Sequence, residues 1–130
     1  MSDVKCARLM YRAAERDVLT LRSMTADAPV ESFGFHVQQA AEKVLKAWLA
    51  LLGETYPLTH SLETLLEHLA DRGAAVESFR DLVDYTPYTV EFRYVGVDPD
   101  AEPINRKAAL ALVQALHERV GRRLAEAEEA

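Results

Sequence analysis

Residues 30–53, VESFGFHVQQAAEKVLKAWLALLG, carry the pattern that decides the fold. The apolar side chains of this stretch recur at spacings of three and four, which places them along one side of an α-helix. This wide stripe comprises Val37, Ala40, Ala41, Val44, Leu45, Trp48, Leu51 and Leu52. We expect the helix to cover residues 30–52 and to end at Gly53, because glycine reaches the left-handed conformation without a Cβ clash.

The same periodicity predicts two more helices. Residues 3–24 should form the first, with an apolar face made of Ala7, Tyr11, Ala14, Val18 and Leu21. Another should begin after Thr59 or Ser61, because either hydroxyl can accept a hydrogen bond from the unpaired N–H groups of a first turn. Its pattern ends at Arg72 and Gly73. Its buried stripe should consist of Leu62, Leu65, Leu66 and Leu69.

The second half of the chain predicts a short helix, an irregular segment and a long final helix. The short helix covers residues 76–84, and Pro87 prevents it from continuing. Residues 89–95 have a β-prone composition, but a lone strand would leave its backbone groups unpaired, so we expect an irregular or short helical piece. The final helix should open near Pro103 and run to residue 126. Its apolar face should consist of Ala109, Leu112, Val113, Leu116, Val120 and Leu124.

These elements together predict an all-α fold, an up-and-down bundle of about five helices, as one domain over residues 1–130. No apolar run approaches the ~20 residues that span a bilayer, so we expect no membrane association. The first residues lack the apolar core of a signal peptide, and Cys6 is the only cysteine, which together favour a cytoplasmic protein. The net charge of −6 argues against general nucleic-acid binding.

Polar residues on the central helix form the first candidate site. Four of them fall at offsets of 0, 3, 7 and 10 and therefore share one edge of the helix: His36, Gln39, Lys43 and Lys46. Two ammonium groups and an amide on one edge can receive the oxygens of a phosphate group. The alternative is a solvated face on which Glu42 and Lys46 form an ordinary (i, i+4) ion pair.

Two further candidates lie downstream. His60 can donate to a bound phosphate or act on it, or it can instead cap a helix or bind a loop carbonyl. Arg93, beside Tyr94, can stack on a ring or bind a carboxylate or phosphate with its guanidinium, or it can form a structural ion pair with Glu42 or Glu91. No spacing predicts a metal site, a glycine-rich phosphate loop or a Ser or Cys nucleophile, so no cofactor and no catalytic residue are assigned.

Three pieces of the sequence resemble the HEPN family, the "higher eukaryotes and prokaryotes nucleotide-binding" domains. Residues 38–47, QQAAEKVLKA, resemble the family signature, and residues 56–62, YPLTHSL, match its next piece. Arg93 and Tyr94 come about thirty residues later, so the similarity spans nearly the whole chain. The residues that match recurring polar positions of the family are Gln39, Glu42, Lys43, Lys46, His60, Arg93 and Tyr94.

The resemblance implies a HEPN bundle that is commonly a homodimer and acts together with a minimal nucleotidyltransferase. The HEPN partner is proposed to hold a nucleotide or a substrate, and many such pairs look like toxin–antitoxin systems. A nucleotide of the ATP or GTP class is therefore the expected ligand. The resemblance places it at Gln39, Lys43, Lys46, His60, Arg93 and Tyr94.

One departure from the family bears on activity. Ribonuclease members carry Arg-x(4–6)-His, whereas no arginine here has a histidine five to seven positions downstream; the nearest approach, Arg106 to His117, is eleven. We therefore favour a nucleotide-binding partner protein over an enzyme. The alternative is a divergent ribonuclease toxin that uses His60 with Arg93.

A third hypothesis is a purely structural, dimerising bundle. In that case Lys43 and Arg93 would simply pair with Glu42 and Glu91. Substituting either cation would then lower thermal stability and leave every binding signal unchanged.

Overall fold

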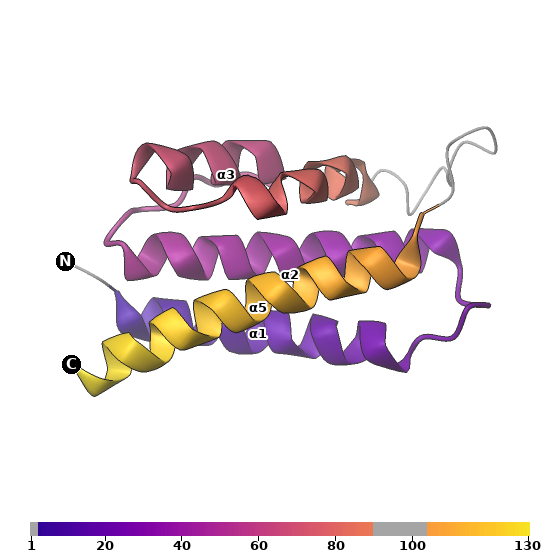
Figure 1. The fold of residues 1–130 in the computed structure, drawn as a ribbon, viewed down its shortest axis with the longest axis horizontal. Coiled ribbons are helices and arrows are strands. Elements are labelled where there is room, and N and C mark those ends of the chain that lie inside the picture. The colour runs from indigo at the N-terminus through magenta and orange to yellow at the C-terminus, as the bar shows by residue number, and fades with distance from the viewer. Residues whose placement is uncertain (1–2, 90–103) are drawn as a thin grey trace.

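The computed structural model describes residues 3–89 and 104–130, and helices make up most of this part of the chain (Figure 1). Within these ranges there is no strand, so the predicted all-α fold is confirmed. The elements in chain order are α1 (Val4–Ser23), α2 (Val30–Leu51), α3 (Leu62–Asp71), the 3-10 helix η1 (Glu77–Tyr88) and α5 (Arg106–Glu129). Residues 90–103, which include Arg93, Tyr94 and most of the predicted irregular segment, lie outside the described residues.

The helices are arranged around α2. In Figure 1, α1 runs antiparallel to α2. Helix α5 lies across both of them and runs in the same direction as α2, and α3 and η1 cover another side of α2. Contacts join α2 to each of the other four helices. The start of α1 and the end of α5 lie at the same end of the bundle (Figure 1). No helix within the described ranges is long and apolar enough to cross a membrane.

The predicted apolar stripe of α2 is buried as expected, but burial extends well beyond it. Fourteen of the 22 residues of α2 are buried, including Gln38, Glu42 and Lys46. The stripe residues Leu51 and Leu52 are only partly buried. A helix surrounded on several sides has little face left for solvent, so polar side chains on α2 need partners inside the protein.

Local capping explains where most helices begin and end. Ser61, rather than Thr59, caps α3, because its hydroxyl accepts a hydrogen bond from the Thr64 N–H at 3.2 Å. Gly53 comes after α2 with a φ of 79°, as predicted for a glycine in the left-handed region. The final helix begins at Arg106, three residues after Pro103, because the Asn105 side chain accepts from the Ala108 N–H at 3.0 Å; it ends at Glu129, a little beyond the predicted residue 126.

The predicted short helix of residues 76–84 is instead a longer 3-10 helix that includes Pro87. Its inward side chains repeat every three residues: Phe79, Leu82, Tyr85 and Tyr88. A 3-10 helix has three residues per turn, so this spacing aligns the four side chains on one face. The repeat of three, visible in the sequence, was the signal that the prediction missed.

Two glycines let tyrosine rings lie directly against helix backbones. A Cβ atom at Gly34 in α2 would overlap the ring of Tyr88, and a Cβ atom at Gly121 in α5 would overlap the hydroxyl of Tyr11. The Tyr11 hydroxyl donates to the backbone oxygen of His117 at 2.9 Å, and the Tyr11 ring stacks on the His117 ring with centroids 4.2 Å apart. These contacts fix η1 on α2 and α1 on α5.

Candidate functional site

The polar edge of α2 divides into two clusters of hydrogen bonds. In the first, which we name the Asp17 cluster, the carboxylate of Asp17 on α1 lies between two side chains of α2. Its Oδ1 lies 2.9 Å from His36 Nδ1, and its Oδ2 accepts from Lys43 Nζ at 2.8 Å. Asp17 is buried, whereas His36 and Lys43 are partly exposed. A buried carboxylate with two donors is stable because both of its oxygens are satisfied.

The second cluster, the Glu42 cluster, gathers three donors on one buried carboxylate. Glu42 Oε1 accepts from Gln38 Nε2 at 2.8 Å and lies 2.8 Å from His60 Nδ1, and Oε2 accepts from Lys46 Nζ at 3.2 Å. Gln39 extends the network, because its Nε2 donates to Gln38 Oε1 at 2.7 Å. The cluster therefore connects three successive turns of α2 to the loop before α3.

The electrostatics of this cluster hold Glu42 in its charged form. Burial alone raises the pKa of the carboxyl, but hydrogen bonds from Gln38 and His60 and the charge of Lys46 outweigh burial and lower the pKa below its usual value. Lys46 also lies over the ring of Tyr56, 5.6 Å from the centroid. The ammonium is thus neutralised inside the protein.

His60 is the member of the Glu42 cluster that meets solvent. Its side chain is 69% exposed, whereas that of Glu42 is 8% exposed. Because Glu42 holds Nδ1, the ring presents Nε2 outward in a fixed orientation. A neutral ring that donates Nδ1–H to Glu42 offers Nε2 as a base, and a protonated ring offers Nε2–H as a donor to an anion.

The structure brings some of the predicted site residues together and separates others. Gln39, Lys46 and His60 meet in one network around Glu42, and the predicted (i, i+4) pair of Glu42 and Lys46 is present. Lys43 turns the other way, and it pairs with Asp17 rather than with Glu42. Arg93 and Tyr94 lie outside the described residues, so their approach to α2 remains a prediction.

Sequence reasoning missed two participants, Asp17 and Gln38. Asp17 interrupts the apolar face of α1 between Ala14 and Val18, and a charged residue in such a stripe signals a buried partner. Gln38 stands directly beside Gln39 in the sequence, and its side chain is wholly buried. Its Nε2 also donates to the backbone oxygen of His60 at 3.2 Å, which ties the loop to α2.

Neither cluster has the composition of a metal site. Across residues 3–89 and 104–130, no three His, Cys, Asp or Glu side chains gather as metal ligands. Each carboxylate instead has a lysine and a histidine as neighbours. The arrangement suits proton transfer or the binding of an anion at His60.

Comparison with protein-family models matches the chain to the HEPN domain over residues 7–124. This match runs from the first turn of α1 to the last turns of α5 and so includes both clusters. Comparisons with curated proteins and with solved structures return no match.

Proposed function

The chain belongs to the HEPN domain family, and from this membership we propose that it is a cytoplasmic, homodimeric, nucleotide-binding partner of a minimal nucleotidyltransferase, in a pair of the toxin–antitoxin kind. The observation that supports this proposal most is the Glu42 cluster. It brings the polar residues of α2 to His60, a histidine from a different part of the chain, and leaves its ring open to solvent.

The charges of the two clusters identify which groups would meet a phosphate. Lys43 is paired with Asp17 and Lys46 with Glu42, so each ammonium is already neutralised by a carboxylate. His60 Nε2 faces outward, and the contact of its Nδ1 with Glu42 orients the ring. Because Lys43 turns toward Asp17, His60 and not Lys43 is the group of the two clusters that would meet the phosphate.

Isothermal titration of the protein with ATP and with GTP tests nucleotide binding. We expect saturable binding that is weakened about tenfold or more by His60→Ala, because a charge-assisted hydrogen bond is lost. Arg93→Ala should weaken binding as well. His68→Ala is the matched control, because His68 lies on α3 and pairs with Glu54 instead. Absence of saturable binding by the unmutated protein would refute the proposal.

The partner and the oligomeric state need separate measurements. Light scattering on the purified protein should give the mass of a dimer. Co-expression with a nucleotidyltransferase encoded beside this chain should yield a complex that survives gel filtration. If the purified protein is a monomer and forms no complex with the nucleotidyltransferase, the proposed role as a homodimeric partner is wrong.

The Glu42–His60 contact also supports a second candidate function, a divergent ribonuclease toxin. A carboxylate that orients an imidazole is a common arrangement for general acid–base catalysis, and Arg93 would supply the cation for the phosphate. Expression without a partner should then arrest growth, and both His60→Ala and Glu42→Gln should abolish the arrest. Harmless expression of the unmutated protein would exclude this function.

A further inference from the structure

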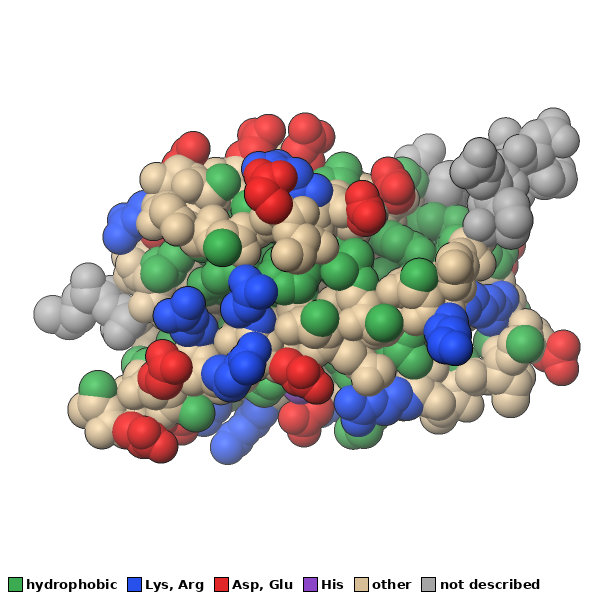
Figure 2. Space-filling model, viewed as in Figure 1, with side chains coloured by type: hydrophobic (Ala, Val, Ile, Leu, Met, Phe, Trp, Pro, Cys, Tyr) green, Lys and Arg blue, Asp and Glu red, His purple; other side chains and the backbone are tan. Residues whose placement is uncertain are grey.

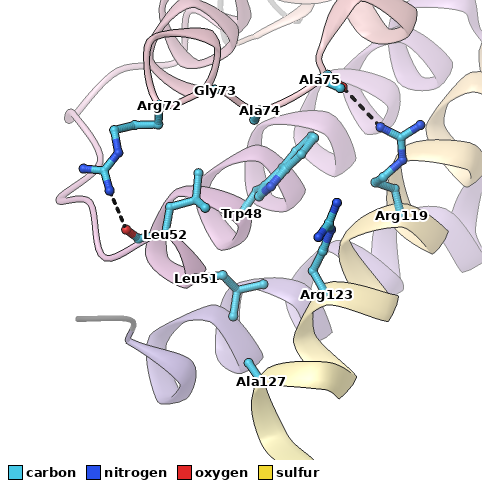
Figure 3. A pocket seen from close by; sticks show the side chains of 10 residues that line it. All are labelled: Trp48, Leu51, Leu52, Arg72, Gly73, Ala74, Ala75, Arg119, Arg123 and Ala127. Carbon is cyan, nitrogen blue, oxygen red and sulfur yellow. Dashed lines mark hydrogen bonds between the residues drawn. The ribbon is translucent and has the colours of Figure 1, made fainter. Parts of the chain in front are cut away.

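A cavity of about 360 Å³ opens beside the C-terminal end of α2 (Figure 3). It lies between the end of α2, the loop after α3 and the last turns of α5. Trp48, Leu51 and Ala127 form its apolar part. Trp48 comes two residues after Lys46, which is about 200° around the helix, and no residue of the Glu42 cluster lines the cavity.

The charged part of the cavity is entirely basic. Arg72, Arg119 and Arg123 line it, and no acidic side chain does, although the chain as a whole carries a net charge of −6. In Figure 2, blue side chains gather over the C-terminal part of α5, close to this opening. A local positive field in an acidic protein favours an anion at this position.

Two of the three arginines are held by the protein. Arg72 pairs with Glu54 and donates to the backbone oxygen of Leu52 at 3.3 Å. Arg119 donates to the backbone oxygen of Ala75 at 3.1 Å and lies over the Phe79 ring, 5.1 Å from its centroid. These contacts hold both arginine side chains in place at the edge of the cavity.

Arg123 differs from them, because it forms no hydrogen bond or ion pair with any residue in the described ranges. Figure 3 shows its guanidinium projecting from α5 toward Trp48. Arg119 precedes it by one helical turn, and two like charges at this spacing repel each other. Arg123 is exposed, so an anion between the two arginines would relieve the repulsion and take the place of water at the Arg123 N–H groups.

We infer that this cavity binds a small organic anion in which an aromatic ring carries a carboxylate or a phosphate group. The ring lies against Trp48 and Leu51, and the anionic group binds Arg123, with Arg119 adding positive charge. A cavity of this size is within the range of small-molecule sites, of which an apolar wall with a few polar groups is typical. Arginine binds both oxyanions through paired N–H groups.

Nuclear magnetic resonance of the full chain tests this inference. Trp48 is the only tryptophan, so its indole N–H gives a single signal that reports on the cavity. The probes are 2-naphthoate and 2-naphthyl phosphate, which carry both chemical features. 2-Naphthamide supplies the ring without charge, and inorganic phosphate supplies charge without the ring. The variant is Arg123→Gln, and Arg122→Gln on the same helix is the control, because Arg122 does not line the cavity.

We expect one or both ring-bearing anions to shift the Trp48 signal saturably, and the binding identifies which oxyanion is preferred. Arg123→Gln should raise the Kd about tenfold or more, and Arg122→Gln should leave it within about twofold. The inference is overturned if neither anion saturates the signal, if 2-naphthamide or phosphate binds as tightly as the anions, or if Arg123→Gln binds like the unmutated protein.

Discussion

Glu42 Oε1 lies 2.8 Å from His60 Nδ1, and this contact joins a buried carboxylate in the middle of α2 to an imidazole that is largely exposed. A loop histidine thereby acquires a fixed ring orientation without being buried itself. The carboxylate is held charged by its other donors, Gln38 and Lys46. The stability of the bundle and the chemistry of His60 consequently depend on one side chain.

Glu42→Gln should destabilise the fold by about 1–3 kcal/mol at pH 7, because Lys46 would stay buried without its counter-ion. The folded-state pKa of Glu42 is lowered, so its contribution is present above the ordinary pKa of 4.5 and is lost as the pH falls below that value. Urea denaturation at pH 7 and pH 3.5 measures this. The difference in the free energy of unfolding between the unmutated protein and the variant should be smaller at pH 3.5 than at pH 7. An equal difference at both pH values would contradict a charged, stabilising Glu42.

Asp17→Asn should cost more stability than Lys43→Met, because Asp17 contacts both His36 and Lys43, whereas the Lys43 ammonium contacts only Asp17 within the described residues. The coupling between Asp17 and Lys43 in a double-mutant cycle should be about 0.5–1 kcal/mol, since the ammonium is partly screened by solvent. Thermal denaturation of the two single variants and the double variant measures it. Additive losses would mean that the two side chains do not interact in solution.

Gly121→Ala should destabilise the packing of α1 on α5 by about 1–3 kcal/mol, because the added Cβ overlaps the Tyr11 hydroxyl. Tyr11→Phe alone should cost about 1 kcal/mol through loss of the hydrogen bond to the His117 oxygen. In the Tyr11→Phe background, Gly121→Ala should cost less than it does alone, because the overlapping oxygen is absent. A cost that is unchanged or larger in that background would show that the hydroxyl is not the obstacle.

His117 should make the fold less stable in mild acid. Burial lowers the pKa of His117 below its ordinary 6.5, and its Nε2 has no hydrogen-bond partner among residues 3–89 and 104–130. The unfolded chain therefore takes up a proton more readily, and the contribution of His117 to stability is lost as the pH falls from 6.5 toward the lower folded-state pKa. In His117→Gln, the melting temperature should decrease less between pH 7 and pH 5 than it does in the unmutated protein. A variant with an unchanged slope would assign that loss to other groups.

The amino-acid sequence by itself determined the helices and their buried faces. The stripe from Val37 to Trp48 is buried as its spacing predicted, and Gly53 and Ser61 mark helix ends because glycine tolerates positive φ and serine can cap free N–H groups. The family was evident from the sequence as well, since residues 38–47 and 56–62 carry its signature. These features are local, and a few neighbouring residues are enough to specify them.

Only the tertiary structure decided which polar side chains meet. Periodicity placed Lys43 and Lys46 on one edge of α2, but α1 brings Asp17 to Lys43, and the loop before α3 brings His60 to Glu42. The cavity at Trp48 likewise combines Arg72, which follows α3, and Arg123 of α5, which are far apart in the chain. Spacing within one helix fixes the direction of a side chain relative to that helix, whereas its partner depends on how separate helices rotate and pack against one another.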